Sequence, residues 1–151
     1  MDSLNAHLQT MSGTPSNPLC PPLIFTAGLP ALSSLWLTLS DTGGADVVMA
    51  STAYGGSSEL TDIYEGRGGV RKHKFDITGS NPVIPGIKTV LDTLERDPEE
   101  TEETSEMKRM KRTVVFVEVP SNPDMKVVDL GELREVLEEY GERVGKEVSV
   151  C

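Results

Sequence analysis

Three short stretches of the sequence carry residue types that could hold a small polar ligand. Gly28-Leu29 lies in a turn before a predicted helix, where free backbone N–H groups and the helix dipole attract an anion. Tyr54 could stack on a flat ligand, and the glycines after it would let the backbone come close. Glu118 and Asn122 are a carboxylate and an amide that could orient a polar substituent on a ring.

Each stretch also has a simpler structural interpretation. The glycine turn could merely cap its helix, Tyr54 could be a core residue, and Glu118 and Asn122 could cap a strand end and hold their own turn. The nucleotide-binding patterns G-x-x-x-x-G-K-[ST] and G-x-G-x-x-G do not occur in the sequence. His7 and His73 have no partners at metal-ligand spacing, so we expect no metal site.

The elements that must position these stretches alternate between strands and helices, which is typical of an α/β sheet. A buried strand is expected from Thr113 up to Glu118, where a parallel sheet would lead into a binding site. The other predicted strands are 23–25, 46–51, 71–77 and one from residue 146. Helices are predicted from Pro30 as the first helical position, from a cap at Ser57 or Ser58, over 84–94, and from 130 to a glycine at 141 or 145.

Composition limits the domain organisation and the partners. Residues 1–22 are expected to be irregular, 23–151 to form one partial domain, and 95–112 to be a charged loop insertion. The net charge of −10 argues against nucleic acid, and no apolar run approaches the roughly 20 residues that span a membrane. Two cysteines make no disulfide framework, which favours a reducing, cytoplasmic compartment.

Three longer stretches resemble, in order, the cysteine and methionine metabolism family of pyridoxal-phosphate enzymes. They are FTAGLPALSSLWLTL, ADVVMASTAYGGSSELTDIY and TVVFVEVPSNPDMKVVDLGELREVL. VEVPSNPDMKVVDL is similar to the family pattern E-[TV]-P-[ST]-N-P followed by K-V-x-D, and TAYGGS to its Y-G-G-T. The family includes cystathionine gamma-synthase, cystathionine lyases and methionine gamma-lyase. The resemblance implies part of the large domain of an aspartate-aminotransferase-like (fold type I) enzyme, with a mostly parallel sheet flanked by helices.

The resemblance also implies roles for individual residues. Gly28 and Leu29 match a turn whose backbone amides hold the cofactor phosphate. Tyr54 matches a tyrosine that stacks on the pyridine ring and can take part in proton transfer. Asn122 matches an asparagine near the phenolic oxygen of the ring, and Glu118 matches the acid that supports this turn. The implied cofactor is pyridoxal 5'-phosphate.

Some features of the family are not found in this sequence. The family has an aspartate for the pyridinium nitrogen just after the strand that here begins at Lys146, and a Schiff-base lysine later still; the sequence ends at Cys151, before both. We therefore expect no catalysis by these residues alone. The implied function is part of a homo-oligomeric, tetrameric lyase or transferase that acts on small sulfur amino acids by β/γ-elimination or replacement. The alternative is a non-catalytic α/β module acting as an interaction or regulatory subunit.

Overall fold

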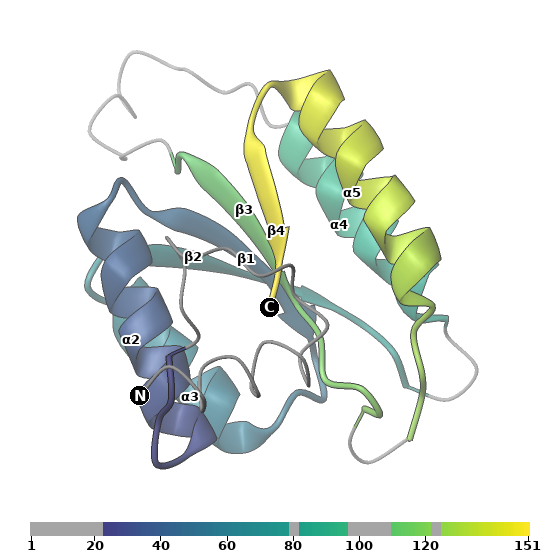
Figure 1. Cartoon of the computed structure of the whole chain (residues 1–151). Coiled ribbons are helices and arrows are strands. Elements are labelled where there is room, and N and C mark those ends of the chain that lie inside the picture. The colour runs from purple at the N-terminus through teal and green to yellow at the C-terminus, as the bar shows by residue number, and fades with distance from the viewer. Residues whose placement is uncertain (1–22, 79–81, 97–109, 122–124) are drawn as a thin grey trace, which may run out of the picture.

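The computed structural model describes residues 23–78, 82–96, 110–121 and 125–151. Four parallel strands form one sheet in the order β2-β1-β3-β4. Helices α2 and α3 cover one face of the sheet, and α4 and α5 cover the other (Figure 1). The elements in chain order are α2 (Gly28–Asp41), β1 (Ala45–Ala50), α3 (Gly55–Glu65), β2 (Val70–Phe75), α4 (Val83–Arg96), β3 (Arg112–Phe116), α5 (Leu130–Val144) and β4 (Glu147–Val150).

The central strands β1 and β3 are apolar because both of their faces are covered. Val47 of β1 and Val114 of β3 pack with Trp36 of α2 on one face. Val48 and Val115, one position further along each strand, pack against α4 and α5 on the other. A continuous run of Val and Met is the pattern expected of such strands, so the predicted parallel sheet flanked by helices is confirmed.

Helix α5 begins and ends as its sequence predicts. The Asp129 carboxylate accepts hydrogen bonds from the N–H groups of Gly131 at 2.8 Å and Glu132 at 3.1 Å. Gly145 follows the last turn in a left-handed conformation with φ of 64°, which decides between the two glycines proposed as its end. The buried side chains of α5 recur at helical spacing: Leu133, Val136, Leu137 and Tyr140.

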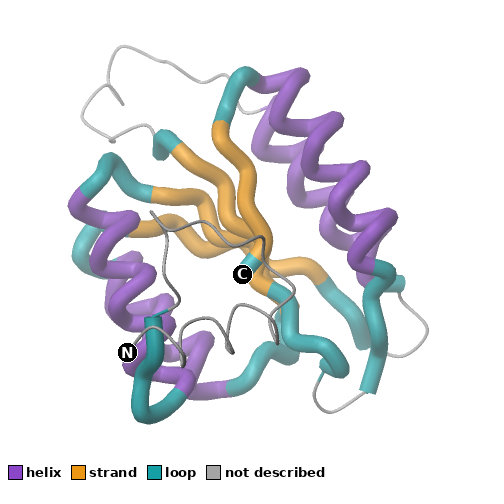
Figure 2. The backbone as a smooth tube through the Cα atoms, in the orientation of Figure 1, coloured by secondary structure: helices purple, strands orange, loops and turns teal. Residues whose placement is uncertain are grey.

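The backbone path shows where the functional stretches meet (Figure 2). Each parallel strand ends at the same edge of the sheet, and β1 leads into α3 there while β3 leads into the loop at 117–121. The N-terminus of α2 lies beside that of α3, because Leu29 reaches Gly56. This edge therefore brings the stretches at residues 28–29, 54 and 118 together. No helix in the described part of the chain is long and apolar enough to cross a bilayer.

Two predictions about the beginnings of elements are wrong. Residues 23–25 form no strand and are not part of the sheet, and Leu23 is 79% exposed. Helix α2 begins at Gly28, so that Pro30 occupies its third position. The early start is compatible with proline because the first N–H groups of a helix have no intrahelical acceptor.

The predicted cap of α3 and the predicted ends of β2 also need correction. Tyr54 is the N-cap residue of α3, with no side-chain cap, and Ser57 lies buried inside the first turn. Strand β2 spans Val70–Phe75 rather than 71–77. The Lys72 side chain on this edge strand is only 6% exposed, because it turns onto α3 and pairs with Asp62.

Candidate functional site

A hydrogen bond between two loops forms the centre of the site. Glu118 lies two residues beyond the end of β3, and both of its carboxylate oxygens accept from the Tyr54 backbone N–H, at 3.1 and 3.2 Å. Tyr54 follows β1 and precedes α3. A carboxylate at the N-terminus of α3 is also favourable for the helix dipole. Glu118 thus joins the loop after β3 to the loop after β1 and fixes the backbone of Tyr54.

The Tyr54 ring lies on the surface, unlike the other tyrosines. Tyr54 is 55% exposed, whereas Tyr64 and Tyr140 are 7% and 2% exposed. The interpretation of Tyr54 as a core residue is therefore wrong. An exposed aromatic ring at the carboxyl edge of a parallel sheet is available to stack on a flat ligand.

Helix α2 presents free donors next to this ring. Its N-cap residue, Ala27, makes no side-chain cap, and its first turn begins with a bond from the Ala31 N–H to the Ala27 carbonyl at 3.4 Å. The N–H groups of Gly28 and Leu29 have no acceptor among the described residues. A Cβ at position 28 would meet nothing within 4 Å among the described residues, so their side chains do not fill the space beside this turn.

The turn that contains Asn122 is closed by its neighbours, although Asn122 itself lies outside the described residues. Ser121 is 7% exposed. Its N–H donates to the Lys126 carbonyl at 2.8 Å, and its hydroxyl accepts from the Lys126 N–H at 3.0 Å. Ser121 is not among the residues predicted from the sequence. Its signal is a serine directly before Asn-Pro, a position where a hydroxyl commonly bonds back to the turn.

A small cavity of about 20 Å³ lies under the Glu118 loop. Its lining includes Thr52, Glu118, Ser121 and Lys126 together with apolar side chains from the ends of the strands. The volume is enough for about one water molecule. A ligand the size of a pyridine ring would therefore lie outside the cavity, against the exposed Tyr54 ring. No group of metal-binding side chains is found anywhere in the described ranges.

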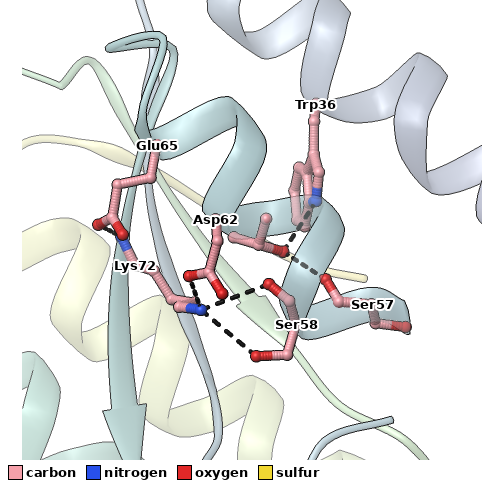
Figure 3. A network of polar contacts seen from close by, with 7 residues as sticks. Trp36, Ser57, Ser58, Asp62, Glu65 and Lys72 are labelled. Carbon is pink, nitrogen blue, oxygen red and sulfur yellow. Dashed lines mark hydrogen bonds and ion pairs between the residues drawn. The ribbon is translucent and has the colours of Figure 1, made fainter. Parts of the chain in front are cut away.

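Hydrogen bonds between side chains hold α3 against α2 (Figure 3). The Trp36 indole N–H donates to the Thr61 hydroxyl at 3.1 Å, and that hydroxyl donates to the Ser57 carbonyl at 2.8 Å. Trp36 is 0% exposed. Because Ser57 lies in the first turn of α3, this chain of bonds determines where that turn, and hence Tyr54, lies relative to α2.

Lys72 attaches α3 to strand β2 in the same network (Figure 3). Its ammonium pairs with the Asp62 carboxylate and donates to the carbonyl and hydroxyl oxygens of Ser58, each at 3.3 Å. The Lys72 backbone N–H donates to Glu65 at 2.7 Å. Helix α3 is thus attached to the edge strand along its length, which makes it a rigid support for the site.

Comparison with known proteins identifies the family. A sequence model described as Cys/Met metabolism PLP-dependent enzyme matches residues 3–145. The chain belongs to this family. The match begins inside the segment expected to be irregular, earlier than the resemblance seen in the motifs. The cofactor of the family is pyridoxal phosphate, as the resemblance implied. A search of curated proteins found no match.

Solved structures of the family share the fold. Cystathione gamma lyase (CalE6) from Micromonospora echinospora is 28% identical with a TM-score of 0.51, over 83% of this chain and 26% of that one. Cystathionine gamma synthase from Xanthomonas oryzae pv. oryzae, solved with aminoacrylate and cysteine, is 23% identical with a TM-score of 0.59, over 97% and 30%. The present chain spans 26–30% of the length of these structures. The predicted fold class, part of a fold type I large domain, is confirmed.

The described residues are compatible with the cofactor of the family. Gly28 and Leu29 offer N–H groups that have no acceptor among the described residues, at the start of a helix, which suits a phosphate. The exposed Tyr54 ring lies next to the same helix, which suits a pyridine ring. Both features occur at the carboxyl edge of the sheet, where ligands of α/β proteins bind.

Proposed function

We propose that this edge of the sheet forms one side of a pyridoxal-phosphate site, in a protein that acts on small sulfur amino acids by elimination or replacement at the β or γ carbon. The observation that carries the proposal is the bond from the Tyr54 N–H to Glu118, because it unites two of the three motifs and leaves the aromatic ring exposed beside α2. The solved complexes of the Xanthomonas enzyme with cysteine and with cystathionine support this class of substrate.

Each residue has a distinct task in this proposal. The N–H groups of Gly28 and Leu29 bind the phosphate, and the dipole of α2 adds to the attraction. The Tyr54 ring stacks on the pyridine ring, and its hydroxyl holds a proton near the reacting carbon. Glu118 orients Tyr54 through the backbone. For Asn122, which lies outside the described residues, the resemblance implies a place near the phenolic oxygen of the cofactor ring. Pyridoxal phosphate, when bound, supplies an electron sink for bond breaking at the amino-acid carbon.

Titration of the 151-residue chain with pyridoxal phosphate tests the proposal. We expect saturable binding in equilibrium dialysis, weakened roughly tenfold in Tyr54→Ala by loss of the aromatic stacking. Ile63→Ala is the matched control, since Ile63 is a similarly exposed apolar residue, 52% against 55%, two turns further along α3. Its affinity should equal that of the wild type.

Glu118→Gln tests the observation on which the proposal depends. The amide keeps the shape of the side chain but weakens a charge-assisted hydrogen bond to the Tyr54 N–H. We expect weaker cofactor binding with little change in thermal stability. The alternative role, an interaction or regulatory subunit without cofactor, is supported instead if the wild-type chain shows no saturable binding.

A further inference from the structure

Helix α3 begins with two glycines whose surroundings differ. A Cβ added to Gly55 would meet no atom within 4 Å. A Cβ added to Gly56 would lie 2.7 Å from Cε1 and 3.4 Å from Cδ1 of the Tyr54 ring. Neither glycine has a positive φ, so the helical backbone alone would accept alanine at both positions. The requirement at position 56 therefore comes from the space that the Tyr54 ring occupies.

The ring, rather than the backbone, would have to move if this space were filled. The Tyr54 backbone is held by Glu118 on one side, and its carbonyl accepts the Ser58 N–H of α3 at 3.0 Å on the other. The ring makes no hydrogen bond within the described residues, and Tyr54 is 55% exposed. A carbon–carbon separation of 2.7 Å is well inside van der Waals contact, so a methyl group at position 56 would displace the ring.

The same space also accommodates a side chain from α2. The Leu29 Cδ1 atom would lie 3.2 Å from a Cβ at position 56. Leu29 follows Gly28 at the start of α2, so Gly56 lies next to both the aromatic ring and the turn proposed to hold the phosphate. A larger residue would press on both features at once.

We propose that Gly56 is a positioning residue, which sets the orientation of the Tyr54 ring and its separation from the start of α2. Gly55 has no part in this role. The placement of the ring can be measured without a ligand. Only the expected effect of Gly56 on ligand binding rests on the proposed cofactor site.

The test compares Gly56→Ala with Gly55→Ala, which make the same change at neighbouring positions of one helix. Both variants gain similar helix propensity, so their thermal stabilities should be alike. In side-chain NMR spectra of tyrosine-labelled chain, the Tyr54 ring signals should shift in Gly56→Ala, and those of Tyr64 and Tyr140 should not. Gly55→Ala should leave all of them unchanged.

Binding of pyridoxal phosphate gives the second measurement. We expect roughly tenfold weaker binding in Gly56→Ala, because the ring no longer lies in the stacking position, and wild-type binding in Gly55→Ala. In a Tyr54→Ala background, Gly56→Ala should have a smaller effect than in the wild type, since the contact at 2.7 Å with the ring is gone and the looser contact at 3.2 Å with Leu29 remains.

Three results would overturn the inference. The first is unmoved Tyr54 signals in Gly56→Ala, the second is an equal effect of Gly55→Ala, and the third is a marked loss of folding confined to Gly56→Ala. If the wild-type chain fails to bind pyridoxal phosphate, the proposed function fails. The NMR comparison then still decides whether Gly56 positions the ring.

Discussion

Asp46 is a buried acid surrounded by basic side chains. Its side chain is 1% exposed, yet one oxygen accepts from Arg71 Nε at 2.7 Å and lies 3.0 Å from His73 Nε2. Lys146 Nζ is 3.7 Å from the other oxygen, which has no hydrogen-bond partner in the described part of the chain. Burial raises the pKa of the Asp46 carboxyl, but hydrogen bonds from His73 and Arg71 outweigh it, so the net pKa is lowered.

The lowered pKa of Asp46 predicts the pH dependence of stability. The unfolded chain takes up this proton more readily, so the contribution is present above the unfolded pKa of 3.8 and is lost as pH falls through the folded value. In Asp46→Asn, the free energy of unfolding should therefore fall less steeply than in the wild type as the pH is lowered through this range. The substitution should also lower the free energy of unfolding at pH 7 by about 2 kcal/mol, because Arg71 and Lys146 lose their counter-charge.

Urea unfolding as a function of pH measures both effects. Asp92→Asn is the control, since Asp92 pairs with Arg143 on the surface at 3.0 Å and its side chain is 48% exposed. We expect the control to change stability by less than about 1 kcal/mol. If the free energy of unfolding of Asp46→Asn and of the wild type falls equally steeply as the pH is lowered, the lowered pKa of Asp46 is contradicted.

At the level of elements, the contact between α2 and α3 decides the geometry of the site. The buried Trp36 indole N–H reaches across to the Thr61 hydroxyl, which is itself 0% exposed. A buried donor that loses its acceptor costs more free energy than the hydrogen bond contributes when it is made. The two residues should therefore behave as one energetic unit.

Thr61→Val removes the hydroxyl with little change of shape. We expect the free energy of unfolding to fall by about 1–3 kcal/mol, because the Trp36 N–H is left buried without an acceptor. Trp36→Phe also destabilises the chain, through lost packing, and the double variant should cost less than the sum of the single changes. Circular dichroism during urea unfolding measures all three; additive costs would show that the bond is energetically unimportant.

A control for this cycle is available on the surface of α2. The Thr38 hydroxyl donates to the Ser34 carbonyl at 2.8 Å within its own helix, in an exposed setting. Thr38→Val should change stability by no more than about 0.5 kcal/mol. A larger effect would indicate that threonine hydroxyls in this chain stabilise helices locally, rather than by joining them.

For the whole molecule, the two outer strands of the sheet decide how the chain can associate. Strands β2 and β4 each pair on one side only within the described residues. Next to β4, a surface groove contains Leu130 and Leu137 of α5 together with Val148 and Val150 of the strand. Val150 is 47% exposed and Leu130 is 58% exposed. An apolar face beside an unpaired strand favours association.

We therefore expect the 151-residue chain to self-associate as its concentration rises. Val150→Lys should reduce this association, because a charge at a strand edge opposes pairing with another chain. Val127→Lys is the control, since residue 127 is 73% exposed but lies in the loop before α5. Sedimentation velocity over a range of concentrations measures the effect, and a monodisperse wild-type monomer throughout would contradict the prediction.

The elements with a clear pattern of apolar residues could be predicted from the sequence. The Val-rich strands β1 and β3 and the amphipathic helix α5 lie close to their expected positions, because burial on both faces or on one face leaves a clear pattern. The expected strand at 23–25 fails because three apolar residues do not specify a pairing partner. The expected serine cap of α3 is wrong because the first residue of a helix depends on contacts with neighbouring loops, and the pattern of apolar residues does not indicate these contacts.

The sequence by itself determined the types and order of the functional residues, and these were enough to indicate the family. Only the tertiary structure decided how these residues act on one another. It placed Glu118 on the Tyr54 backbone, distinguished Gly56 from Gly55, and brought Arg71 and Lys146 to Asp46. Such contacts join residues far apart in the chain, and they depend on strand order and register, which no local pattern of residue types encodes.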